Sequence, residues 1–208
     1  MFGLRSKSFL VILFAILLSG CADIKKQIDE IARQVDPIEF QDIENYLNQQ
    51  GIDTQQAAAR ASILARAATW VNLKIPYNQQ FYLDGYRTDC SGFVSYAWKL
   101  KDSNQKPISP DTIALGKIHG VNIYIENIQP GDIINNRRAG NDGHVVVFVR
   151  WVDEKHTKFM AYEENGGYGK AVQTELTITY NEDKSFTIQE YNIKAPGPYY
   201  AQRSPYIP

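Results

Sequence analysis

A cysteine and a histidine in this chain stand in settings that suit nucleophilic chemistry. Cys90 lies in Asp89-Cys90-Ser91-Gly92, where an apolar stretch with helical spacing begins, and His144 opens a run rich in β-branched residues. A cysteine in the first turn of a helix meets the partial positive charge of the helix terminus, which favours thiolate over thiol. A histidine fixed at the start of a packed strand can serve as base and ion-pair partner. The pair predicts catalysis through an acyl-enzyme.

Two further histidines stand in settings that suit a base less well. His119 has no apolar strand around it, and His156 closes a charged stretch that is typical of a turn. The structural alternatives for the chosen pair are a small buried cysteine and a core histidine that bonds a backbone carbonyl. We predict that Cys90 is the nucleophile and that His144 is the base.

A catalytic imidazole is usually oriented by a third polar group. In the strand expected after His144, alternation puts Phe159, Ala161 and Glu163 on one face. With the two apolar residues packed inward, Glu163 falls on the side of the site near the strand end. A register slip of one residue would substitute Glu164, and Asn165 is a third choice.

The N-terminus has the pattern of an export signal. A short basic flank precedes an apolar run at 9–18, which is too short to cross a bilayer comfortably, and small residues follow it. Residues 18–21, Leu-Ser-Gly-Cys, resemble the bacterial lipobox, which implies cleavage before Cys21 and attachment of lipid to its thiol. The alternative is an uncleaved anchor helix. Acyl chains on Cys21 would hold the protein on a membrane by burying methylenes.

The cysteine count supports a chemical role for Cys90. The chain has 2 cysteines, so lipid on Cys21 leaves Cys90 without a partner inside the chain. Structural cysteines of exported proteins normally come in pairs. We therefore expect a lipid-anchored protein on the periplasmic face of a Gram-negative envelope, and Ala22 in place of an Asp favours the outer membrane.

Composition limits the other function classes. The chain has 208 residues, of which 44% are hydrophobic, and a formal net charge of −1, so nothing in it indicates a nucleic-acid partner. The length supports one sizeable core. We divide the chain into a signal peptide at 1–20, a polar helical tether at 21–53 and a hydrolase domain at 54–208.

The elements that must position the site follow from periodicity. Thr54 is a plausible N-cap for an Ala-rich helix at 55–73, and Asp89 can cap a second helix that reaches about residue 101. The turn at 130–131 leads into strand-like segments. These segments are 132–134, 144–152, 158–163, 174–180 and 186–193. Helices followed by antiparallel strands predict an α+β domain, with the helices packed on the sheet.

Three motifs together resemble the NlpC family of bacterial cell-wall cysteine peptidases. They are DCSGFV at 89–94, QPGDI at 129–133 and GHV at 143–145, and the match covers roughly residues 56–195. Pro76-Tyr77 also resembles the upstream Pro-Tyr of the family, whose tyrosine lines the active site.

The resemblance implies a papain-like fold with Cys90 as nucleophile, His144 as base and a polar third residue. It also implies cleavage of the γ-D-glutamyl–diamino acid bond in peptidoglycan stem peptides. The chain departs from the family in three ways. Asn78-Gln79-Gln80 replaces the Gly-Gly that often follows the tyrosine, Glu163 stands where a histidine is common, and no recognisable wall-binding repeat precedes the domain.

The expected reaction needs no metal or cofactor. The Cys90 thiolate attacks an amide carbonyl, and His144 protonates the leaving amine and then activates water. The backbone N–H of Cys90, assisted by Tyr77, can donate to the oxyanion. Asp89 and Ser91 are further candidates for substrate contact. The alternatives are an acyltransferase or deamidase with the same acyl-enzyme, and a binding scaffold without activity.

Overall fold

A long helix forms where the sequence is richest in alanine. In the computed structural model, which describes residues 45, 47–49, 51–182, 185–191 and 195–208, helix α4 spans Thr54–Leu73. The N-cap is Asp53 and not the predicted Thr54, because the Asp53 carboxylate accepts the N–H of Gln55 at 2.9 Å. The expected signal peptide, the lipidation site Cys21 and most of the tether lie outside the described residues.

The next helix after α4, α5, carries the predicted nucleophile. It spans Cys90–Trp98 and ends three residues before the predicted end, because Lys99 takes a left-handed conformation with φ 53°. Gly92 is required by close packing on the neighbouring strand. A Cβ at Gly92 would lie 1.8 Å from the carbonyl oxygen of Arg87.

A ribbon before α5 and a short helix after it in the sequence were not predicted. Strands β1 (Asn78–Leu83) and β2 (Tyr86–Thr88) form a two-stranded antiparallel ribbon. A short helix, α6 (Thr112–Ile118), begins after its N-cap Asp111. The side chains of β1 are mostly exposed, so the strand has no apolar alternation to reveal it. His119 lies at the C-terminal end of α6.

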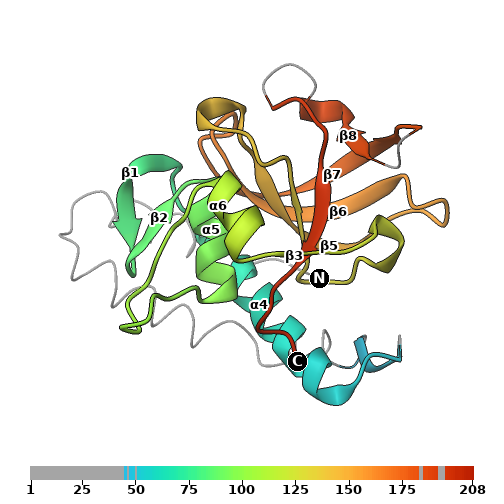
Figure 1. Ribbon diagram of the computed structural model, residues 1–208, viewed down its shortest axis with the longest axis horizontal. Helices are drawn as coiled ribbons and strands as arrows, with labels where there is room; N and C mark the ends of the chain where they lie inside the picture. The colour runs from blue at the N-terminus through green and yellow to red at the C-terminus, as the bar shows by residue number, and fades with distance from the viewer. Residues whose placement is uncertain (1–44, 46, 50, 183–184, 192–194) are drawn as a thin grey trace, which may run out of the picture. The chain divides into compact units, whose positions relative to one another are not determined.

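The described residues after 120 form a seven-stranded antiparallel sheet in the order β3-β9-β4-β5-β6-β7-β8. Figure 1 shows the helices to one side of this sheet. The strand bounds are Val121–Asn122 (β3), Ile133–Asn135 (β4), Val145–Trp151 (β5), Lys158–Asn165 (β6), Lys170–Tyr180 (β7), Phe186–Ile188 (β8) and Tyr200–Arg203 (β9). Three short 3-10 helices lie between strands, at Ile125–Asn127 (η1), Gly140–Asp142 (η2) and Gln189–Tyr191 (η3).

The predicted strands lie at the expected positions, but not all of them have the predicted length. Strands β5 and β6 match their predictions within two residues, and His156 lies in the turn between them. The last predicted strand, 186–193, is shorter: β8 ends at Ile188 and η3 follows directly. The chain is therefore mixed helix and antiparallel sheet, as predicted.

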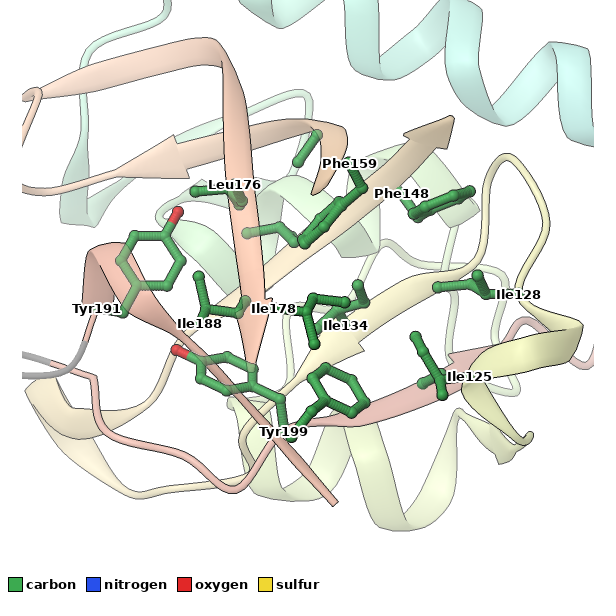
Figure 2. Packing of buried hydrophobic residues seen from close by; sticks show 14 of the residues in the cluster. Ile125, Ile128, Ile134, Phe148, Phe159, Leu176, Ile178, Ile188, Tyr191 and Tyr199 are labelled. Atoms are coloured by element: carbon green, nitrogen blue, oxygen red, sulfur yellow. The ribbon is translucent and has the colours of Figure 1, made fainter. Parts of the chain in front are cut away.

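A large apolar cluster packs against one face of the sheet. Phe159 and Ala161 of β6 are fully buried in it, together with Val146 and Phe148 of β5. Figure 2 shows Phe159 beside Phe148, and Tyr191 at the edge near Ile188. Since side chains alternate along β6, Glu163 continues the face of Phe159 and Ala161.

The helices pack against the sheet, as the sequence suggests. Helices α4 and α5 both contact β5 and β6. Before α4, Leu47 is fully buried against Ala57 and Ala61, so the end of the expected tether packs on this helix. Within the described ranges, no helix is both long and apolar enough to cross a membrane.

Candidate active site

Cys90 is the first residue of α5, and its position depends on the cap before it. The Asp89 carboxylate accepts the N–H of Gly92 at 2.8 Å and the Nε of Arg87 at 2.5 Å. The cap holds the N-terminal turn in place, so the Cys90 side chain lies where the helix dipole favours an anion. Cys90 is a free cysteine and is mostly buried.

Asp89 and Ser91 flank Cys90 in the sequence. Both are buried, and Arg87 binds both of them, since its Nη2 donates to Ser91 Oγ at 2.8 Å. Neither residue lines the cavity that opens at Cys90. The geometry therefore gives these two residues a supporting role for the helix terminus, in place of the predicted contact with substrate.

His144 is held at the entrance to β5 by backbone contacts. Its N–H donates to Asn136 Oδ1 at 2.9 Å, and its carbonyl accepts the N–H of Asn136 at 3.2 Å. Gly143 before it is tightly enclosed, because a Cβ there would lie 2.3 Å from the carbonyl oxygen of Arg138. This enclosure puts the Gly143 carbonyl 3.9 Å from Cys90 Sγ and brings the start of β5 close to Cys90.

The third predicted residue lies beside the imidazole. Nε2 of His144 is 2.8 Å from Oε2 of Glu163, which leaves Nδ1 as the nitrogen for Cys90. The predicted face of β6 is therefore the observed one. Glu164 points to the other face, and Asn165 supports Glu163 by donating from Nδ2 to Oε2 at 2.8 Å.

Two more residues complete the environment of Glu163. Thr174 Oγ1 donates to Glu163 Oε1 at 2.7 Å, and the Tyr191 hydroxyl donates to Oε2 at 2.5 Å. The ring of Tyr191 also meets the ring of His144 edge-on, with centroids 4.8 Å apart. Sequence analysis missed both residues, because they come from β7 and η3 and no local pattern marks them.

The charges in the site favour an imidazolium. Burial lowers the pKa of His144, but hydrogen bonds and charge interactions with Cys90 and Glu163 raise it to about 10. Burial raises the pKa of Glu163, yet the His144 partner and the two hydroxyl donors bring it below its ordinary value. At neutral pH the site therefore holds a carboxylate and an imidazolium next to Cys90.

A cavity of about 1230 Å³ opens at Cys90 and His144. Its lining includes Tyr77, Asn141 and Tyr191, so the predicted tyrosine does lie at the site. Burial, followed by the neighbouring Cys90, raises the pKa of Tyr77 to about 12. The Tyr77 hydroxyl therefore keeps its proton and can act as a donor at neutral pH.

The remaining histidines lie elsewhere. His119 ends α6, and His156 stacks on Trp151 with ring centroids 4.6 Å apart. Neither lines the cavity at Cys90. In the part of the chain that the structure describes, no group of three or more His, Cys, Asp or Glu side chains could hold a metal ion.

No family model matches the chain, and no curated protein matches its sequence.

Proposed function

We propose that this chain is a papain-like cysteine hydrolase that cleaves amide bonds in peptidoglycan stem peptides, of the D-glutamyl–diamino acid endopeptidase type. The observation that carries the proposal is the position of His144, which interacts with Cys90 and with the buried Glu163. A nucleophile, a base and an orienting group in contact in this order are the arrangement that acyl transfer requires. The substrate class comes from the resemblance of the motifs at 89–94 and 143–145 to the NlpC family.

The proposed reaction has two steps. Cys90 Sγ attacks the carbonyl carbon, and the electron pair of the C=O bond moves to oxygen. The oxyanion is met by the Cys90 N–H and the Tyr77 hydroxyl. The tetrahedral intermediate collapses as the C–N bond breaks and His144 protonates the leaving amine. Water, deprotonated by His144, then attacks the thioester and releases the acid and the thiol.

The test is mass analysis of purified peptidoglycan digested with the detergent-solubilised full chain. We expect new fragments whose masses fix the bond cut, and none with the Cys90→Ala variant. Fragments in which an amine or ammonia has been exchanged would favour the acyltransferase or deamidase. An intact wall with both proteins would favour a binding scaffold or another substrate.

We also propose that lipid on Cys21 anchors the enzyme at the membrane, on the periplasmic side. The lipobox pattern at 18–21 supports this placement. Metabolic labelling with a fatty acid should mark the wild-type chain and not the Cys21→Ser variant, which should accumulate as a precursor. Equal labelling of both proteins would remove the anchor from the proposal.

A further inference from the structure

Gln79, at the start of β1, makes two contacts across the mouth of the active-site cavity. Its Nε2 donates to the Tyr77 hydroxyl oxygen at 3.0 Å and to Asn141 Oδ1 at 3.3 Å. An amide nitrogen carries two protons and accepts none, so one –NH2 group serves both oxygens. The two partners lie on different sides of Cys90 in the sequence, and all three residues line the same cavity with Cys90.

These contacts decide which way the Tyr77 proton points. A tyrosine hydroxyl has one proton and can also accept. Because Gln79 supplies a proton to the oxygen, the hydroxyl proton must point away from Gln79. Across the described residues, the Tyr77 hydroxyl donates to no protein acceptor. Its proton is left for a group that binds in the cavity beside Cys90.

We propose that Gln79 is a positioning residue that fixes the Tyr77 hydroxyl as a donor to the oxyanion formed on Cys90. The inference rests on the proposed acyl-enzyme chemistry and adds a residue to it. During attack, the S–C bond forms and the carbonyl electron pair moves to oxygen. Tyr77 donates a hydrogen bond to that oxygen and keeps its proton. The preorganised direction of this donor is what Gln79 contributes.

Two substitutions at Gln79 separate positioning from packing. Gln79→Glu keeps the size of the side chain but exchanges the donor for an acceptor, so the carboxylate should accept a hydrogen bond from the Tyr77 hydroxyl and turn that donor away from the oxyanion. Gln79→Ala removes the contact but leaves the hydroxyl free to rotate toward the oxyanion. A purely structural role predicts the opposite order, since glutamate fills the space better than alanine does.

The measurement is the burst of p-nitrophenol when p-nitrophenyl acetate acylates Cys90 in the full chain, a reaction that requires no peptidoglycan. We expect the acylation rate to fall about 10-fold in Gln79→Ala and about 100-fold in Gln79→Glu. The rate of alkylation by iodoacetamide, which forms no oxyanion, should stay within about threefold of wild type in both variants. Gln173→Glu, an exposed change of the same kind on β7, is the control and should acylate normally.

The Tyr77→Phe background supplies the decisive comparison. Without the hydroxyl, the acylation rates of the Glu and Ala variants at position 79 should become equal within about twofold, because no donor remains to be turned. The inference fails if Gln79→Glu acylates as fast as Gln79→Ala, or if their difference persists without the hydroxyl. It also fails if the wild-type chain gives no burst. Normal acylation behaviour with an uncut wall would overturn the substrate assignment alone.

Discussion

Glu163 and Glu164 are neighbours on β6, both fully buried, and they have opposite surroundings. The Glu163 carboxylate has four partners, which are His144, Asn165, Thr174 and Tyr191. Neither oxygen of Glu164 has a hydrogen-bond partner among the described residues. Adjacent side chains of a strand point to opposite faces, so one residue step separates the two environments.

The difference shows that partners, more than burial, decide the charge of a buried carboxyl. Burial acts on both residues in the same direction, but the donors around Glu163 lower its pKa below the ordinary value. Burial, with the nearby charges of Asp89 and Glu163, raises the pKa of Glu164 to about 9. Glu163 is therefore a carboxylate at neutral pH and Glu164 is a neutral acid. The two faces of β6 therefore differ: one holds a carboxylate against His144, and the other buries a neutral acid.

The largest effect should come from removing Cys90, the proposed nucleophile. Cys90→Ala should reduce hydrolysis by several orders of magnitude, because no acyl-enzyme can form. Its folding should change little, since alanine keeps the start of α5 and the Asp89 cap. Peptidoglycan digestion and thermal unfolding of the variant check both parts. Substantial hydrolysis by a folded Cys90→Ala protein would remove the assignment.

Replacing Glu163 and Glu164 with glutamine, one at a time, tests the comparison directly. Glu163→Gln should lower kcat/KM about 10- to 100-fold, because the imidazolium loses its charged partner and the amide –NH2 opposes one of the donors. The alkaline limit of activity should also move to lower pH, since Glu163 contributes to the raised pKa of His144. Glu164→Gln should keep kcat/KM within about threefold. The account of the two faces is wrong if the second change costs as much activity as the first.

The stability difference between Glu164→Gln and wild type should depend on pH. The unfolded chain loses the Glu164 proton near the ordinary pKa of 4.5, whereas the folded chain holds it until about pH 9. Stability of the wild type therefore falls as pH rises through this window, and glutamine removes the fall. We expect the variant to be more stable by about 1–3 kcal/mol at pH 8, with a much smaller difference near pH 4.5.

The measurement is chemical unfolding of both proteins at several pH values. Glu175→Gln is the matched control, because Glu175 is half-exposed and makes a 3.5 Å ion pair with Lys158. Its stability should change by less than about 0.5 kcal/mol at every pH. The stability difference between Glu164→Gln and wild type is compared at the two pH values. If the variant gained less stability over wild type at pH 8 than at pH 5, Glu164 would have an unrecognised charged partner.

Loss of a single donor to Glu163 should have a small effect on activity. Thr174→Val removes the hydroxyl at 2.7 Å and leaves three partners in place. Tyr191→Phe removes the hydroxyl at 2.5 Å but keeps the ring against His144. Each change should lower kcat about two- to fivefold with KM unchanged, because the carboxylate is still held. A loss as large as that of Glu163→Gln would show that one donor alone holds the carboxylate.

Sequence analysis predicted the elements whose patterns are local. The helices at 54–73 and 90–98 and the central strands follow from apolar spacing, and period-2 alternation put Glu163 on the correct face. The ribbon of β1 and β2 was missed, because its exposed strand has no apolar face. The position of the α4 cap was wrong by one residue, since Asp53 and Thr54 are both good caps.

The supporting residues of the site could not be predicted from the sequence. Thr174 and Tyr191 reach Glu163 from segments 11 and 28 residues away, and their contacts depend on how three separate elements pack. Gln79 was noted as a departure from the family pattern, but its bond to Tyr77 depends on the course of β1. Long-range side-chain contacts of this kind leave no periodic signal in a single sequence.

We propose that His144 and Cys90 form an ion pair that Glu163 orients. The most direct test is the rate of Cys90 alkylation by iodoacetamide as a function of pH, in wild type and in His144→Ala, His119→Ala and His156→Ala. We predict that the wild-type thiol reacts well at mildly acidic pH, and that His144→Ala moves the profile to higher pH, because the thiolate loses its cationic partner. The other two variants should superimpose on wild type. A profile that His144→Ala leaves in place, or that His119→Ala shifts, would contradict the account.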